Sequence, residues 1–325
     1  MEYRKLGKSG LQVSIAGLGT NNFGGRLDQA GTSAVVHSCI DHGVNLIDTA
    51  ESYGRGLSEE FIGNAVKGHR RDVLIATKFG NNGRPGSGGR NYIMNAVTDS
   101  LKRLKTDYID LYQVHFPDTT TPIDETLRTL DDLVREGKVR YVGCSNFSAW
   151  QVVEAQWTAR SEHLDAFISA QNAYNLLDRG IEKDLAPVSM QYGLSVIPYS
   201  PLRGGFLTGK YKHGEAPPEG ARLSAPGGQG SRVLTDDNFA KLATLEKYAE
   251  EHDHTVGELA LAWLSSQSHV GSVIAGAMNP QQVAENVKAV EWKLSPQDLK
   301  DLDAAMGIEP PAPRGGFGGG PPAAR

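Results

Sequence analysis

Two short apolar segments, YIDLYQVH (Tyr108–His115) and VRYVGCS (Val139–Ser145), enclose a stretch of helical periodicity at Ile123–Val134. In that stretch, apolar side chains recur every three or four residues, as on one face of an amphipathic helix. The flanking segments are apolar nearly throughout, which is typical of strands buried on both faces of a parallel sheet. The whole unit therefore predicts strand, helix and parallel strand.

The same alternation extends along most of the chain. The predicted strands are Ser14–Thr20, Asn45–Ala50, Val73–Lys78, Tyr108–His115, Val139–Ser145, Ala166–Asn172, Leu194–Ser200 and Gly271–Gly276. Helical patterns include Asn95–Leu104, Ile123–Val134, Thr235–Glu251, Thr255–Ser266, Gln281–Val290 and Ser295–Met306. Eight such units in roughly 300 residues predict an α/β fold, a (β/α)8 TIM barrel.

Three segments fall outside this repeat. Tyr3–Ser14 predicts an N-terminal β-hairpin, with its turn at Lys8–Gly10, that closes the bottom of the barrel. Gly204–Val233 is a long Gly/Pro-rich insertion after the seventh strand, and loops of that length are usually functional or mobile. We predict one barrel domain over 1–308 and extra C-terminal helices, followed by a flexible Pro/Gly-rich tail at 309–325.

Composition excludes several classes of protein. The 325 residues contain 33 Lys and Arg against 38 Asp and Glu, a net charge of −5 that provides no basic field for nucleic acid. No apolar run reaches the roughly 18 residues of a membrane span, and the N-terminus lacks a signal region. Two cysteines, Cys39 and Cys144, exclude a disulfide framework and a paired-cysteine metal site. We expect a cytoplasmic protein without a metal, nucleic-acid or membrane partner. The sequence does not indicate its oligomeric state.

Polar side chains stand where the predicted strands end. Asp48, Lys78 and His115 close the second, third and fourth strands, and Tyr53 follows the second. Each has an ordinary structural explanation alone, such as a helix cap for Asp48. In a TIM barrel, however, these strand ends meet at the end of the barrel that carries active sites. Together they predict a catalytic group.

Those four residue types suit proton delivery to a carbonyl that accepts a hydride. Tyrosine is a weak acid with an ordinary pKa of about 10, and a nearby ammonium such as that of Lys78 favours its phenolate. Asp48 would hold Lys78 charged and oriented, and His115 would hydrogen-bond the carbonyl oxygen. On the next strands, the amide and hydroxyl side chains suit a carboxamide and Tyr199 suits a flat nicotinamide ring. The carboxamide set is Ser145, Asn146 and Gln171.

The chain resembles the aldo-keto reductases from the N-terminal hairpin to about Met306. The motifs are GVNLIDTAESYG (Gly43–Gly54), ATKFG, TDYIDLYQVHFPD, GCSNF, QNAYN and IPYSPLRGG. The resemblance implies a nicotinamide cofactor bound without a Rossmann fold and a small-molecule carbonyl substrate. It implies a catalytic tetrad with Tyr53 as general acid: Asp48, Tyr53, Lys78 and His115.

The resemblance also implies how the chain holds that cofactor. Ser200, Leu202 and Gly204 would cover the pyrophosphate, and Glu285 and Asn286 would hold the adenine. Many members of the family place a cation for the 2′-phosphate of NADPH near the start of the last barrel helix. Here that region carries only uncharged residues, Met278, Asn279 and Gln282.

Cations for the 2′-phosphate could come from another loop. The sequence is similar to the potassium-channel beta-subunit branch of the family, which draws these cations from the loop after strand seven. Lys210 and Arg222 stand in the matching positions. NADPH is therefore the expected cofactor, and NADH remains the alternative.

The sequence gives fewer indications of the substrate pocket than of the cofactor site. By position after strands one, three and four, its lining should be Asn21, Asn22, Phe23, Phe79 and Phe116. The asparagines indicate a hydroxylated substrate, such as a sugar-derived carbonyl; alternatively, they only cap a loop. The function expected is NAD(P)H-dependent reduction of an aldehyde or ketone. The alternative is a nucleotide-binding regulatory or redox-sensing subunit on the same fold.

Overall fold

The computed structural model describes residues 1–224 and 230–308; the predicted tail 309–325 lies outside the described residues. Eight strands form one sheet in the order β10-β3-β4-β5-β6-β7-β8-β9, with every pair parallel. The sheet nearly closes, because Val196 of β9 bridges Val270 just before β10. The strands are β3 Ala16–Gly19, β4 Leu46–Asp48, β5 Leu74–Phe79, β6 Ile109–Val114, β7 Val139–Ser145, β8 Ser169–Ala173, β9 Ser195–Tyr199 and β10 Val273–Gly276. The predicted (β/α)8 barrel is confirmed.

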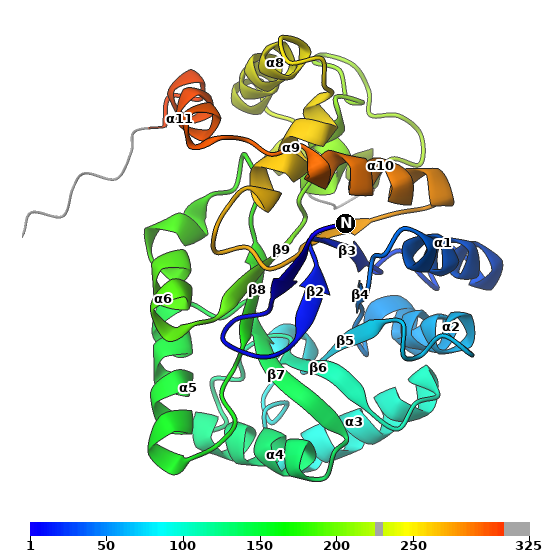
Figure 1. The fold of residues 1–325 in the computed structure, drawn as a ribbon, viewed down its shortest axis with the longest axis vertical. Helices are drawn as coiled ribbons and strands as arrows, with labels where there is room; N and C mark the ends of the chain where they lie inside the picture. The colour runs from blue at the N-terminus through cyan, green and yellow to red at the C-terminus, as the bar shows by residue number, and fades with distance from the viewer. Residues whose placement is uncertain (225–229, 309–325) are drawn as a thin grey trace, which may run out of the picture.

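Helices surround the strands (Figure 1). They are α1 Gln29–Asp41, α2 Leu57–Ala65, α3 Arg90–Leu104, α4 Ile123–Arg135, α5 Ala149–Glu162, α6 Leu185–Tyr192, α7 Gly230–Val233, α8 Asp236–Glu250, α9 Val256–Ser265, α10 Pro280–Glu291 and α11 Pro296–Ala305. In α4 the periodic residues Leu127, Leu130 and Leu133 are fully buried, so the amphipathic pattern did identify the face that packs on the barrel. Acidic residues in its first turn and Arg135 in its last turn stabilise the helix, because their charges are opposite to those of the helix dipole at each end.

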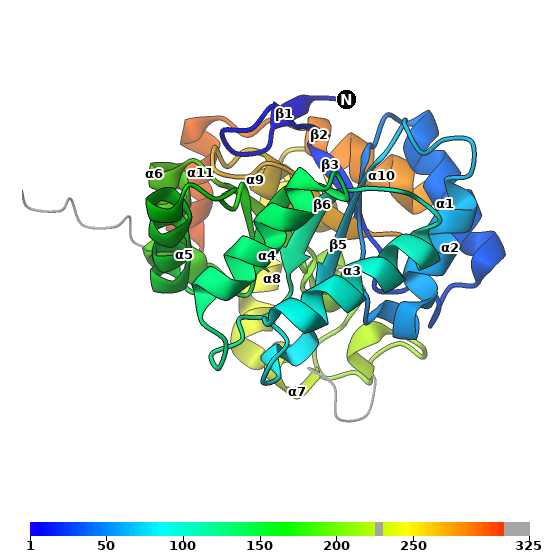
Figure 2. The ribbon, with the colours of Figure 1, turned by 90° about the horizontal axis from the view of Figure 1, so that it is seen from below.

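The N-terminal hairpin closes one end of the barrel. Its strands, β1 Tyr3–Lys5 and β2 Gln12–Ser14, pair antiparallel. Leu6 and Val13 pack with apolar side chains that point into the barrel from Leu46 and Leu111. Figure 2 shows the hairpin and α7 at opposite ends of the molecule. The hairpin end is therefore the bottom, and the loops after the strands gather at the other end.

Several predicted boundaries were wrong. The strand predicted at Ser14–Thr20 is split, because Ser14 belongs to the hairpin and the barrel strand begins at Ala16. The Ser14 hydroxyl donates to the carbonyl of Ala16 at 2.6 Å, which fixes the turn between the two. Helix α3 begins at Arg90 instead of Asn95, since polar residues in its first turn interrupt the apolar pattern.

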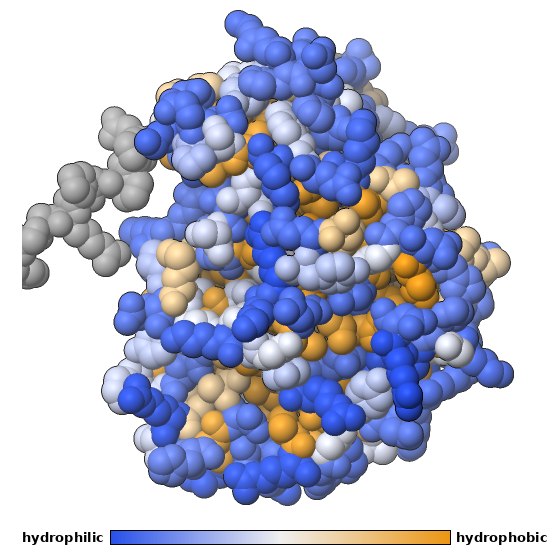
Figure 3. Space-filling view, viewed as in Figure 1, coloured by the Kyte–Doolittle hydropathy of each residue, from blue (hydrophilic) through white to orange (hydrophobic). Residues whose placement is uncertain are grey.

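The surface of the described residues is mainly polar on the face seen in Figure 1. Figure 3 shows polar residues over most of this face, with apolar residues visible between them. Among the helices of residues 1–224 and 230–308, none has the length and apolar character required to cross a membrane.

Candidate active site

The Lys78 ammonium lies at the centre of the site. It donates to Asp48 Oδ2 at 2.6 Å and to the carbonyl of Thr49 at 2.8 Å, and it approaches the Tyr53 hydroxyl at 3.4 Å. Lys78 is fully buried, and Asp48 is 2% exposed. Burial lowers the pKa of Lys78, but the Asp48 carboxylate and the Tyr53 oxygen outweigh burial, so the pKa is raised. Lys78 therefore stays charged beneath Tyr53.

Tyr53 begins a tight turn, Tyr53–Gly56, in the loop that follows β4. Gly54 has φ 57°, and a Cβ there would lie 2.6 Å from the carbonyl oxygen of Phe23. Only glycine allows this approach, which presses the turn against the loop after β3. The Tyr53 ring meets His115 edge to face, with ring centroids 5.8 Å apart. The fold thus brings a phenol, an ammonium and an imidazole together.

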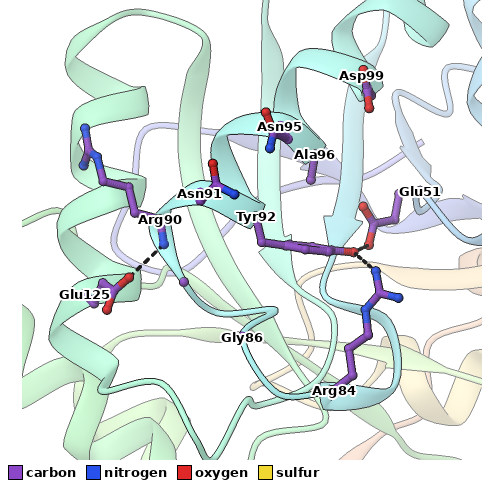
Figure 4. A pocket seen from close by; sticks show the side chains of 11 residues that line it. Glu51, Arg84, Gly86, Arg90, Asn91, Tyr92, Asn95, Ala96, Asp99 and Glu125 are labelled. Atoms are coloured by element: carbon purple, nitrogen blue, oxygen red, sulfur yellow. Dashed lines mark hydrogen bonds between the residues drawn. The ribbon is translucent and has the colours of Figure 1, made fainter.

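Glu51 joins the Tyr53 loop to the end of β5 through hydrogen bonds on either side of Phe79. Figure 4 shows its carboxylate at the Tyr92 hydroxyl. Its backbone N–H donates to the carbonyl of Lys78 at 3.1 Å. Its Oε1 accepts from the Gly80 N–H at 2.9 Å and from the Tyr92 hydroxyl at 2.7 Å. Arg84 in turn donates to the Tyr92 oxygen at 3.2 Å. Sequence reasoning missed Glu51, because an acidic residue in a loop carries no distinctive pattern.

His115 is a neutral imidazole in this site. Burial, followed by the Lys78 ammonium, lowers its pKa from 6.5 to about 3. Its ring stacks on Phe116 at 4.9 Å between centroids, and its Nδ1 is buried without a partner among the described residues. At neutral pH it can hydrogen-bond a substrate oxygen, but it holds no imidazolium proton to give up.

The second carboxylate oxygen of Asp48 accepts from two buried amides. Gln171 Nε2 donates to Oδ1 at 2.8 Å, and Gln113 Nε2 donates to the same oxygen at 3.2 Å. Sequence reasoning missed Gln113. The available signal was a polar side chain within the apolar run of β6, two residues before His115.

The residues expected around a nicotinamide share one cavity of about 300 Å³ with Asp48, Tyr53 and His115. They are Ser145, Asn146, Gln171 and Tyr199. Asn146 is held firmly: Nδ2 donates to the carbonyl of His115 at 2.9 Å, and Oδ1 accepts from the Tyr199 hydroxyl at 2.8 Å. Its φ of 60° is unusual for a residue other than glycine, and such positions concentrate at functional sites.

A second cavity of about 600 Å³ adjoins the first. The two share Ser200, Pro201, Arg222 and Gly276 in their linings. The remaining residues expected around the cofactor all line this second cavity: Leu202, Gly204, Lys210, Gln282, Glu285 and Asn286. Together the cavities extend from Tyr53 to the start of α10.

Three cations line this second cavity: Lys210, Arg222 and Arg26. Burial, followed by repulsion from Arg26, lowers the pKa of both Lys210 and Arg222. Over residues 1–224 and 230–308, no carboxylate lies within 4.0 Å of any of the three. A cluster of unneutralised cations favours an anion, and arginine forms paired hydrogen bonds with phosphate and carboxylate groups. Arg26, in the loop after β3, was missed by sequence reasoning.

The loop after β9 provides a cradle for a large ligand at the junction of the cavities. Ser200, Gly204 and Gly205 have φ of 56°, 69° and 86°. A Cβ on Gly204 would lie 2.9 Å from the Leu223 side chain, so glycine lets the loop pack closely on Leu223. The donor set, the cations and the cradle fit a nicotinamide dinucleotide.

The predicted substrate pocket needs correction. Asn21 and Phe116 line the cavity of Tyr53, but Phe23 and Phe79 do not, since both are fully buried in the hydrophobic core. Phe79 follows Lys78 on β5, and successive strand residues point to opposite faces, so it packs outward against Tyr112.

Asn22 also lies elsewhere than expected. It lines the second cavity, and its carbonyl accepts from the backbone N–H groups of Arg26 and Leu27. These bonds use the backbone carbonyl, which any residue provides, so the alternative that the asparagine side chains cap the loop stays a prediction.

Comparison with known proteins places the chain in a family. The model of the aldo/keto reductase family matches residues 16–306. A probable voltage-gated potassium channel subunit beta of Arabidopsis thaliana is 37% identical over 96% of this chain and 99% of its own length. Protein tas of Escherichia coli (strain K12) is 35% identical over 94% of this chain and 97% of its own. The uncharacterized oxidoreductase YrpG of Bacillus subtilis (strain 168) is 34% identical, over 93% and 95% respectively. With its barrel and buried Lys78 group, the chain belongs to the aldo/keto reductase family.

Proposed function

We propose that the protein reduces an aldehyde or ketone to the alcohol with NADPH. The observation that carries the proposal is the buried Lys78 ammonium, bonded to Asp48 at 2.6 Å and lying 3.4 Å from the Tyr53 hydroxyl. A charge that is costly to bury and stands under a phenol is suited to assisting proton release from that phenol.

The chain's own residues deliver the proton and orient the carbonyl. When bound, the reduced nicotinamide supplies a hydride to the carbonyl carbon. Tyr53 gives its hydroxyl proton to the carbonyl oxygen, and Lys78 stabilises the phenolate left behind. His115, neutral at physiological pH, hydrogen-bonds the same oxygen and fixes its direction. The oxidised cofactor and the alcohol are the products.

The cofactor would lie along the two adjoining cavities. Ser145, Asn146 and Gln171 would meet the carboxamide, with Tyr199 against the ring, and Glu285 and Asn286 would meet the adenine. Lys210 and Arg222, together with Arg26, would meet the phosphates. We favour NADPH over NADH, because each charge-assisted hydrogen bond to the extra phosphate contributes about 1.5–3 kcal/mol.

The substrate class is inferred from the residues of the Tyr53 cavity that are assigned neither to catalysis nor to the cofactor. Phe116 supplies an apolar wall beside His115, and Asn21 supplies an amide at the exposed rim. We propose a small carbonyl compound that carries a hydroxyl near the reacting carbon. Both cysteines, Cys39 and Cys144, are buried free thiols, which suits work in a reducing compartment such as the cytoplasm.

The test is the loss of reduced-nicotinamide absorbance with a reactive aldehyde, measured with NADPH and NADH in parallel. Turnover with NADPH that disappears in Y53F is the expected result. Turnover that survives in Y53F would contradict the assignment of the proton donor.

A second function stays open because of one comparison. The 37% identity with a protein described as a probable channel subunit beta covers nearly both chains. On that basis the protein could bind the nucleotide as a regulatory or redox-sensing subunit. Tight binding of NADPH with no turnover of any carbonyl compound tried would favour this alternative.

A further inference from the structure

A polar layer of side chains crosses the barrel directly beneath the site. Asp48 on β4, Gln113 on β6 and Gln171 on β8 come from alternate strands, as the members of one layer in a TIM barrel do. Such layers are usually bulky and apolar. Two residues earlier on β4 and β6, Leu46 and Leu111 follow that rule and pack in the apolar cluster that closes the bottom of the barrel. The amide side chains of Gln113 and Gln171 therefore require an explanation other than packing of the barrel interior.

The hydrogen bonds fix which atom of each amide faces Asp48. Asp48 is paired with Lys78 and can only accept, so the amide nitrogens of Gln113 and Gln171 must point at it. Gln171 Nε2 lies 3.4 Å from Gln113 Oε1 as well. Gln113 thus donates to the carboxylate and accepts from the neighbouring amide. It is fully buried and does not line the cavity, whereas Asp48 and Gln171 do.

We propose that Gln113 is a positioning residue, whose amide orients Asp48 so that Oδ2 faces Lys78 and keeps the Asp48 carboxylate ionised. The ionised carboxylate in turn holds Lys78 in the charged form that supports proton release from Tyr53. The proposal rests on the proposed function in one respect, the role of Tyr53 as the acid. An amide hydrogen aimed at Oδ1 stabilises the ionised carboxylate. Its positive end also adds to the potential that the ammonium creates at the phenol oxygen.

Several charged or titratable groups face Tyr53. They are Asp48 on β4, Lys78 on β5, His115 after β6, Tyr199 on β9 and Arg222 in the turn Arg222–Ser224. The side chain of Gln113 hydrogen-bonds only one of them, Asp48, and otherwise bonds Gln171. The hydrogen-bonded route from Gln113 to Tyr53 therefore runs through Asp48 and Lys78.

The experiment compares Q113M with Q156M in the cofactor-free protein. Methionine keeps the length of glutamine and removes its amide. Gln156 is the matched control, because it too is buried and donates one hydrogen bond, to the carbonyl of Phe167 at 2.8 Å. The ionisation of Tyr53 is followed by the near-ultraviolet absorbance of tyrosinate, as the difference between each protein and its own Y53F partner.

The ionisation midpoint of Tyr53 is expected to rise by about one pH unit in Q113M, a tenfold change in proton affinity, and to stay at the wild-type value in Q156M. An unchanged midpoint in Q113M would overturn the proposal, and so would an equal shift in Q156M. Q113N is the second variant: its amide is one methylene shorter and falls short of Asp48, so its midpoint must rise too. Circular dichroism at each pH shows that the variant is folded, since Tyr53 of an unfolded chain titrates near its ordinary pKa of about 10.

The same proteins separate this proposal from the proposed function. Wild type and Y53F are assayed with NADPH and a reactive aldehyde. A shifted midpoint without Tyr53-dependent turnover supports the role of Gln113 and contradicts the reductase. Tyr53-dependent turnover with an unshifted midpoint supports the reductase and contradicts the role of Gln113.

Discussion

The Lys78 ammonium and the Asp48 carboxylate meet at 2.6 Å, with side chains 0% and 3% exposed. A buried ion pair of this kind is weak support for stability, because apolar residues of similar volume often do as well or better. The pair also engages the Thr49 carbonyl and lies beside Tyr53. Its placement is therefore better explained by the charge it delivers to the phenol than by any gain in folding free energy.

Breaking that pair on one side should destabilise the fold. K78M leaves Asp48 buried and charged without its cation, which costs about 3–5 kcal/mol of unfolding free energy. The double variant D48N/K78M removes both charges and should recover most of that loss. Urea unfolding of the two variants and wild type measures the difference. Equal destabilisation in both would show that the lost charge partner is not the cause.

The phosphate cluster should discriminate between the two nicotinamide cofactors. R222A is expected to weaken NADPH binding by about 10- to 100-fold and to leave NADH binding unchanged, since only NADPH carries the additional phosphate. K212A is the control, because Lys212 is an exposed cation of the same loop that does not line the cavity. Fluorescence titration with both cofactors gives the affinities. Parallel losses for NADPH and NADH in R222A would move the phosphate site elsewhere.

Glu51 should affect turnover without contacting the substrate cavity. E51A removes the acceptor shared by Gly80 and Tyr92, so the Tyr53 loop loosens and kcat is expected to fall about tenfold, with little change in KM. E51Q keeps an oxygen acceptor and should stay near wild type.

Glu125 supplies the control for this prediction. It accepts from the Arg90 N–H at 2.9 Å in the same surface cavity (Figure 4), away from the Tyr53 loop. E125A should therefore turn over normally. Steady-state kinetics at saturating NADPH provides the comparison, and a loss in E125A as large as in E51A would exclude a specific role for the Tyr53 loop.

The sequence predicted the barrel and the meeting of the strand ends, because both follow from a repeated local pattern. Lys78 could be inferred as buried and in need of an anion, since it ends an apolar run. Side-chain direction at a strand end was harder to judge, and Phe79 was therefore assigned to the pocket although it packs in the core. Arg26 and Gln113 were missed because their roles arise only from neighbours distant in sequence, across the cavity and across the barrel.

The buried imidazole of His115 should make stability depend on pH. Its pKa is lowered from 6.5 to about 3 in the folded protein, so between these values the unfolded chain binds a proton that the folded chain excludes. The contribution is complete above pH 6.5 and is lost as the pH falls toward 3, by up to about 1.4 kcal/mol per pH unit. H115N should therefore lose stability less steeply than wild type between pH 6 and pH 4. H163N is the control, because His163 is exposed and its backbone, with φ 57°, is one that asparagine tolerates. Urea unfolding at each pH gives the slopes, and a slope in H115N as steep as in wild type would mean that His115 is protonated in the folded protein and can act as an imidazolium acid.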